Sequence, residues 1–167
     1  MKAIHLATTI IAVFLLLYTN GIQAQDTVTQ INQVELMKQL LGTWESQMSQ
    51  DTFWTGECKT VWNGLEWSSK TITKGKIIKE AKSLIGYDKK NDKLIESEIN
   101  NINPNIRLYS IWFTSTNKFV AILFEDICNP EKTAFSNYEF KSSDLLIETN
   151  IKNNKTIGTH TYHRVNK

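Results

Sequence analysis

The sequence predicts an all-β protein: a ten-stranded antiparallel up-and-down β-barrel preceded by a short helix. After Gly42 the helical spacing of apolar residues disappears, and about ten strand-like runs follow, separated by short turns. None of these connections is long enough to hold a helix for a parallel crossover, so consecutive strands should pair antiparallel. Such a meander either forms two packed sheets or closes on itself. A closed barrel removes both sheet edges and suits the regular strand spacing.

The N-terminal segment has the layout of a secretory signal peptide over residues 1–24. Lys2 gives a basic start, a dense apolar run extends over 10–18, and a small-residue cleavage site ends at Ala24. The apolar run is shorter than the roughly 20 residues that a spanning helix needs, so we expect cleavage and not a retained anchor. The mature domain is then expected at 25–167, secreted or periplasmic, with no membrane span.

The elements of this domain follow from local patterns. Apolar residues spaced three and four apart over 31–41 predict a short amphipathic helix that ends at Gly42. Asn63-Gly64 is the strongest hairpin signal, because both residues tolerate positive φ. Strands are expected at Thr43–Ser49, Phe53–Trp62, Leu65–Thr73, Lys76–Tyr87, Lys93–Ile99, Ile106–Thr114, Lys118–Ile127, Thr133–Lys141, Asp144–Ile151 and Thr156–Val165.

Composition excludes several classes of protein. With 19 basic and 17 acidic residues the formal net charge is +2, which argues against a nucleic-acid partner. Two cysteines are too few for a disulfide-dense scaffold. Cys58 and Cys128 could pair in an oxidising compartment, but the barrel order places them on roughly opposite walls. Two partly buried thiols are the alternative.

Alternation along the strands assigns an inner face that mixes bulky apolar groups with hydroxyls. We expect this mixture in a barrel with a wet or ligand-filled cavity, whereas plain core packing is the alternative for the aromatic residues. The same alternation points Tyr162 and Arg164 outward. The candidates to line the lumen and bind a ligand are Trp44, Met48, Trp67, Trp112, Phe119, Tyr138 and His163.

The motif Gly42-Thr43-Trp44, placed after a short helix at the start of a ten-strand meander, resembles the calycin superfamily of lipocalins and fatty-acid-binding proteins. Leu40 to Trp44 and Gly86-Tyr87-Asp88 are similar to motifs of secreted bacterial lipocalin-like proteins. The resemblance implies that a basic residue of the last strand, Arg164, packs on Trp44 and closes the barrel beside Gly42.

The sequence contains few residues in patterns typical of metal binding or catalysis. His160 and His163 should point to opposite faces of one strand, so no metal site and no cofactor are expected. No catalytic motif is present, and we interpret Glu96-Ser97-Glu98 as a solvated outer edge of a strand. The predicted function is binding of a small apolar or amphipathic ligand. The alternative is a side-chain-filled barrel that acts as a surface interaction module in the cell envelope.

Overall fold

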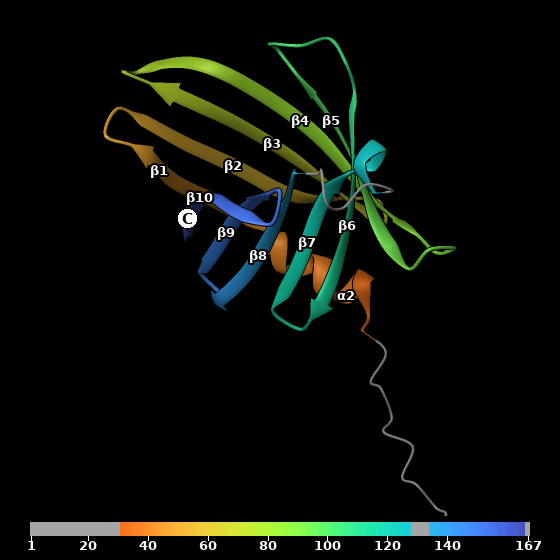
Figure 1. Ribbon diagram of the computed structural model, residues 1–167. Coiled ribbons are helices and arrows are strands. Elements are labelled where there is room, and N and C mark those ends of the chain that lie inside the picture. The colour runs from red at the N-terminus through yellow and green to blue at the C-terminus, as the bar shows by residue number, and fades with distance from the viewer. Residues whose placement is uncertain (1–30, 128–133, 166–167) are drawn as a thin grey trace, which may run out of the picture. The chain divides into compact units, whose positions relative to one another are not determined.

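The computed structural model describes residues 31–127 and 134–165, and these form a closed antiparallel barrel (Figure 1). Each strand pairs with its sequence neighbours, and β1 pairs with β10, so the predicted fold class is confirmed. The elements are α2 (Gln33–Met37), the 3₁₀ turn η2 (Lys38–Leu40), β1 (Gly42–Ser49), β2 (Thr52–Val61), β3 (Gly64–Thr73), β4 (Lys76–Asp88), β5 (Lys93–Asn100), β6 (Arg107–Ser115), β7 (Lys118–Leu123), the 3₁₀ turn η3 (Phe124–Asp126), β8 (Ala134–Ser142), β9 (Leu145–Lys152) and β10 (Lys155–Val165).

The expected signal peptide and its cleavage site at Ala24 lie outside the described residues, as does Cys128. Cys58 is a buried free thiol on β2. Burial raises its pKa to about 12, which keeps the sulfur protonated and weakly nucleophilic.

The helix α2 is held to the barrel by one buried side chain. The Gln33 amide donates to the Phe113 carbonyl at 3.1 Å and accepts from the Phe113 N–H at 2.7 Å, which pairs both of its polar ends. Asn32 caps the helix by accepting from the Glu35 N–H. Met37 and Leu40 point from this segment into the apolar core, so the short helix covers one end of the barrel.

The hairpin between β2 and β3 differs from the sequence prediction by one residue. Its two-residue loop is Trp62-Asn63, and Trp62 takes a φ of 52° with its ring 93% exposed. Gly64 is paired with Val61 in the strand, where an added Cβ would lie 2.5 Å from the Ile85 carbonyl oxygen. This glycine therefore serves close approach of two strands and not the turn itself.

Two further predictions about strands are wrong. The strand expected over Lys118–Ile127 ends at Leu123, because the chain turns there into η3. On β10 the predicted inward face is reversed. Tyr162 pairs with the buried Leu146 and Arg164 pairs with Trp44, so these side chains point inward and His163 is exposed. A register shift between Thr156 and Gly158 breaks the simple alternation at the start of the strand.

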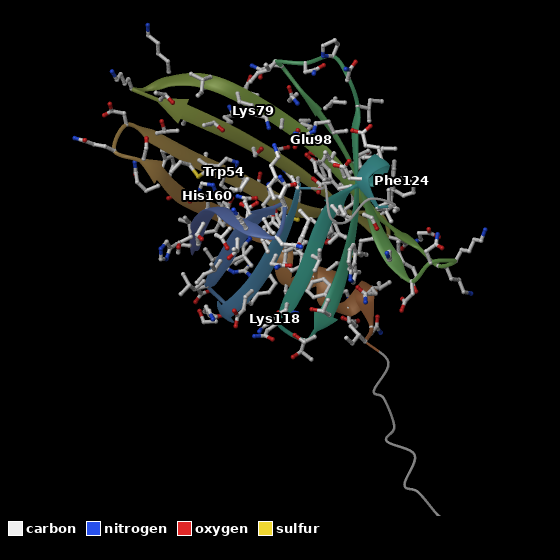
Figure 2. The ribbon with its side chains drawn as sticks, in the orientation of Figure 1. Trp54, Lys79, Glu98, Lys118, Phe124 and His160 are labelled. Atoms are coloured by element: carbon white, nitrogen blue, oxygen red, sulfur yellow. The ribbon has the colours of Figure 1, made fainter. Side chains whose placement is uncertain are left out.

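The end of the barrel near α2 is packed with apolar side chains. Buried residues of this core are Met37, Leu40, Trp44, Cys58, Leu65, Ile85, Leu94, Ile111, Phe113, Phe119, Phe140 and Leu146. Each fully buried side chain of this size contributes about 1.5–3 kcal/mol to folding. Lys118 lies at this end, whereas Lys79 and Glu98 lie toward the other, where the interior is polar (Figure 2).

Candidate functional site

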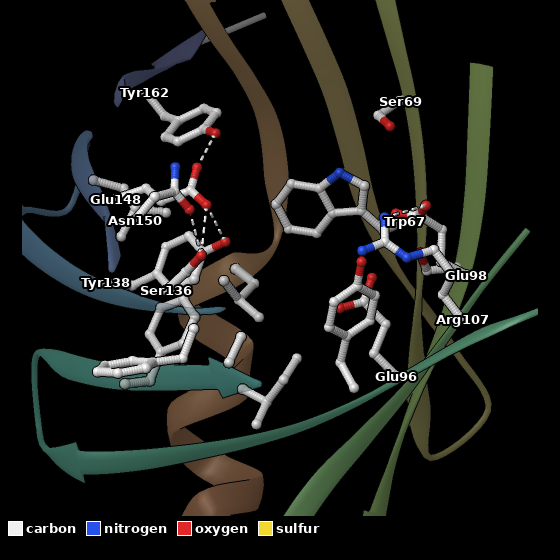
Figure 3. Close-up of a pocket in the computed structure, with 18 of the residues that line it drawn as sticks. Trp67, Ser69, Glu96, Glu98, Arg107, Ser136, Tyr138, Glu148, Asn150 and Tyr162 are labelled. Carbon is white, nitrogen blue, oxygen red and sulfur yellow. Dashed lines mark hydrogen bonds and ion pairs between the residues drawn. The ribbon is translucent and has the colours of Figure 1, made fainter. Parts of the chain in front are cut away.

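The interior of the barrel holds a cavity of about 440 Å³ that is partly open to solvent (Figure 3). Side chains from all ten strands line it, together with Leu40 from η2. Pockets that bind small molecules typically measure about 300–1,000 Å³ and combine apolar walls with a few placed polar groups. The cavity has the size and the mixed lining of such a site.

An open groove of about 540 Å³ also lies against the outer face of β2, β3 and β4. Its walls carry exposed charged side chains, among them Lys70 and Glu80, which form an ion pair at 3.2 Å. Exposed pairs of this kind are well solvated and contribute little binding energy. The interior cavity is therefore the stronger candidate site.

Aromatic rings form much of the cavity wall. The ring centroid of Trp54 lies 6.1 Å from that of Trp67 and 5.0 Å from that of Tyr162, and the Tyr162 ring meets Trp54 edge-on. Phe119 stacks on Tyr138 with ring centroids 4.4 Å apart. Gly56 makes room for both indoles, since an added Cβ would lie 2.4 Å from the Trp54 ring. These faces can contact an apolar or cationic ligand.

A carboxylate with hydroxyl partners occupies the wall formed by β8, β9 and β10. Glu148, only 9% exposed, accepts from the Tyr138 hydroxyl at 2.9 Å and the Tyr162 hydroxyl at 2.5 Å. Ser136 lies 3.0 Å from the same carboxylate and 2.7 Å from the Asn150 amide oxygen, and its single proton serves one of them. This group is called the Glu148 cluster below.

Burial and the nearby Glu148 raise the pKa of Tyr138 and of Tyr162 above the usual tyrosine value. Both phenols therefore stay protonated at neutral pH and act as donors. These donors converge on one carboxyl group, which accepts hydrogen bonds on both of its oxygens. Glu148 stands on β9, which pairs with β8 on one side and with β10 on the other. Tyrosine hydroxyls from both neighbouring strands therefore orient its carboxyl group.

The opposite wall carries Glu96 and Glu98 on β5, where the sequence predicted a solvated outer edge. That interpretation is wrong, because both carboxyl groups share a face with the buried Leu94 and line the cavity. Glu98 pairs with Lys79 at 3.5 Å and with Arg107 at 3.9 Å. The Arg107 guanidinium also lies 5.1 Å from the Tyr109 ring centroid.

Glu98, Lys79 and Arg107 are called the ion cluster below. Glu96 lies beside it, but among the described residues no cation lies at ion-pair distance from Glu96. Burial raises its pKa above the usual 4.5, although a hydrogen bond from Ser83 opposes the shift. Burial likewise raises the pKa of Tyr109 to about 12. In Figure 3 the Glu148 cluster and the ion cluster stand on opposite walls, with the Trp67 indole between them.

The barrel end next to η2 is closed by Arg164. Its guanidinium lies 4.2 Å from the Trp44 ring centroid and donates to the carbonyls of Gln39, Leu41 and Ser143. The Trp44 indole N–H donates to the Leu40 carbonyl at 2.9 Å. Gly42 has a φ of 114°, and a Cβ there would lie 2.8 Å from the Arg164 guanidinium. The structure thus brings together the three residues predicted for barrel closure.

The predicted lumen candidates separate into two groups. Trp44, Trp67, Phe119 and Tyr138 line the cavity, whereas Met48, Trp112 and His163 are not among its lining residues. Trp112 stands on the outer face of β6, where the Lys93 ammonium lies 4.2 Å from its ring centroid. His163 is outside because of the reversed face of β10.

Sequence reasoning missed Trp54, Glu148 and Tyr162 as cavity residues. A signal for Glu148 exists, since it alternates with Leu146 on β9, but an acidic residue on a strand is usually assigned to solvent. Within the described ranges, no group of three His, Cys, Asp or Glu side chains is placed to hold a metal ion. No helix in the same ranges is long and apolar enough to cross a membrane.

Comparison of the sequence with protein families and curated proteins identifies no relative. No protein-family model matches the chain, and no curated protein matches its sequence significantly. The fold and site therefore define the class by geometry: a closed ten-stranded antiparallel barrel with an internal cavity, compatible with a calycin-like fold.

Proposed function

We propose that the protein is a lipocalin-like barrel that binds a small amphipathic molecule in its interior, and that it acts outside the cytoplasm. One observation carries the proposal: the interior cavity of about 440 Å³, in which aromatic walls are combined with two clusters of polar groups. Apolar ligand surface buried there contributes roughly 25 cal/mol per Å². The leader-like segment 1–24 and the pairing of Arg164 with Trp44 support the location and the lipocalin-like family.

The cavity also favours ligand binding over the filled-barrel alternative. A barrel that acted only through its surface would gain stability from filling its interior, because voids lose dispersion contacts. Here the interior keeps charged groups that cost free energy to bury. Charged groups with perturbed pKa values in a cleft are a common feature of functional sites.

The test uses N-phenyl-1-naphthylamine, a fluorescent apolar probe, with the purified full chain. Energy transfer from Trp54 and Trp67 should report one probe bound per chain. Ala121→Phe places a phenyl ring in the cavity and should weaken binding of the probe at least about tenfold, because the ring would occupy the volume that the probe needs. Asn137→Phe adds the same ring at an exposed position of β8 and is the matched control.

The proposal is refuted by either of two results. The probe binds Ala121→Phe as well as it binds the wild type, or it fails to bind the wild type while native mass spectrometry shows a bare chain before and after incubation with a lipid extract. The second result would direct the search to protein partners.

A further inference from the structure

The ligand class can be narrowed from the charges inside the cavity. Its lining holds three carboxyl groups, Glu96, Glu98 and Glu148, and two cations, Lys79 and Arg107. Both cations stand on the wall of β4 to β6, where they pair with Glu98. With Glu96 beside them, this wall holds two positive and two negative formal charges, so it offers an anionic ligand no formal surplus of positive charge.

Glu148 lies on the wall of β8 to β10, which contributes no Lys, Arg or His to the cavity lining among the described residues. Its hydrogen-bond partners there are hydroxyl groups, and no ion pair joins it to a Lys, Arg or His, including His160, its directly opposite neighbour on β10. A charge that is 9% exposed costs free energy unless it is paired. Neutral hydroxyls reduce this cost, but they bring no opposite charge.

The carboxylate also keeps an open acceptor position. Oε1 is the atom that Tyr138 and Ser136 approach, whereas Oε2 accepts from Tyr162 alone within the part of the chain that the structure describes. Each carboxylate oxygen can accept two hydrogen bonds, so Oε2 has capacity for one more donor. An ammonium group carries such donors together with the missing positive charge.

Aromatic rings lie near this position. Tyr138 and Tyr162 hold Glu148 from both sides, and the Trp54 ring lies 5.0 Å from Tyr162. Electron-rich ring faces attract organic cations, and a carboxylate adds a charge-assisted hydrogen bond to an ammonium group. A metal ion fits less well, since rings provide no ligand atoms and the hydroxyl protons already point at the carboxylate.

We propose that the cavity binds an organic monocation: an amine whose ammonium group pairs with Glu148 and whose apolar body packs against Trp54, Trp67 and Phe119. This inference rests on the proposed function, because it names the ligand class of the same cavity. The contact of the ammonium with Oε2 sets the position of the head group, and the rings beyond it accept the apolar part.

The experiment compares three probes that share a naphthyl body and differ in charge: 2-(naphthalen-1-yl)ethylamine, 2-(naphthalen-1-yl)ethanol and naphthalen-1-ylacetate. Calorimetric titration of the wild-type chain should show the amine binding at least about tenfold more tightly than the alcohol, and the acetate most weakly. This comparison needs no variant, so it does not depend on how a substitution affects folding.

Two variants then locate the cation. Glu148→Gln should remove most of the preference for the amine and leave the affinity for the alcohol within about twofold, because the amide keeps the shape and loses the charge. Glu139→Gln is the matched control: it removes one negative charge from the outer face of β8, where Glu139 pairs with Lys141, and should keep the preference. Alcohol binding shows that each variant is folded.

The possible results separate the two proposals. Equal affinity for amine and alcohol, or an unchanged preference in Glu148→Gln, overturns the cation site while ligand binding stands. Tighter binding of the acetate overturns it as well. If the amine, the alcohol and the acetate all fail to bind but N-phenyl-1-naphthylamine still enters the cavity, the cation site alone is wrong. If none of these molecules binds, both proposals are wrong.

Discussion

Arg164 should be the side chain whose loss opens the barrel end. It donates to three carbonyl oxygens, those of Gln39 and Ser143 at 2.8 Å and that of Leu41, and it covers the Trp44 ring. Arg164→Met keeps an apolar stem over the indole and removes the guanidinium. The three carbonyls then lose a charged donor, in a region where the arginine side chain is only 20% exposed.

The expected loss follows from the value of such bonds. A hydrogen bond to a charged group contributes about 1.5–3 kcal/mol, and the partial exposure of Arg164 lets water replace some of the lost partners. We expect Arg164→Met to lower the free energy of unfolding by about 3–4 kcal/mol. Arg164→Lys keeps the charge but has no planar fork, so it should lose about half as much.

The assay is urea unfolding followed by tryptophan fluorescence, with the slope of free energy against urea checked for two-state behaviour. Lys59→Met is the control, because Lys59 forms an exposed ion pair with Glu57 on β2 and its loss should change stability by less than about 0.5 kcal/mol. The reasoning is refuted if Arg164→Met unfolds within about 1 kcal/mol of the wild type.

Three further results are expected. Gly56→Ala pushes a methyl group against the two indoles that the glycine faces, so unfolding should become about 1–3 kcal/mol easier and the emission spectrum should shift; an unchanged spectrum and midpoint would contradict the packing. Burial raises the pKa of Glu96 above 4.5, so the folded state holds its proton more tightly and the free energy of unfolding falls as pH rises above that value. In Glu96→Gln the free energy of unfolding should no longer fall with rising pH, and urea titrations should show the variant to be more stable than the wild type at neutral pH. If the two proteins show parallel curves of stability against pH, Glu96 is not the cause of the pH dependence. Burial raises the pKa of Cys58 to about 12, so in a Cys128→Ser background this thiol should react with Ellman's reagent after unfolding but not before. Rapid reaction of the folded chain would show that the thiol on β2 is accessible and would contradict its burial.

Local signals in the sequence predict most of the fold. The turns after β3, β4 and β9 carry Lys74, Asp92 and Asn153 at positive φ, next to the glycines and polar residues that mark them in the sequence. Alternation and short connections are enough to order ten strands, because each strand pairs with its neighbours along the chain. The closure at Gly42, Trp44 and Arg164 was inferred by resemblance and not from strand periodicity.

The candidate site was only partly accessible from the sequence. Trp67, Phe119 and Tyr138 could be assigned to the interior, because the imperfect alternation on β3, β7 and β8 is still enough to place them on the inner face. Glu96 and Glu148 could not, since a carboxyl group on a strand is read as solvent-facing until its partners are known. Those partners are Ser83 for the first and two tyrosines for the second, which come from other strands.

By itself the sequence determined the order of the elements, the barrel class and an interior of mixed polarity. Only the tertiary structure decided which face of β10 points inward, and therefore that Tyr162 reaches Glu148 while His163 is exposed. The physical reason is that alternation has a period of two, so one register shift reverses every later side chain. Partners on neighbouring strands fix that choice, and a charged group becomes a binding group only when the closed barrel encloses it.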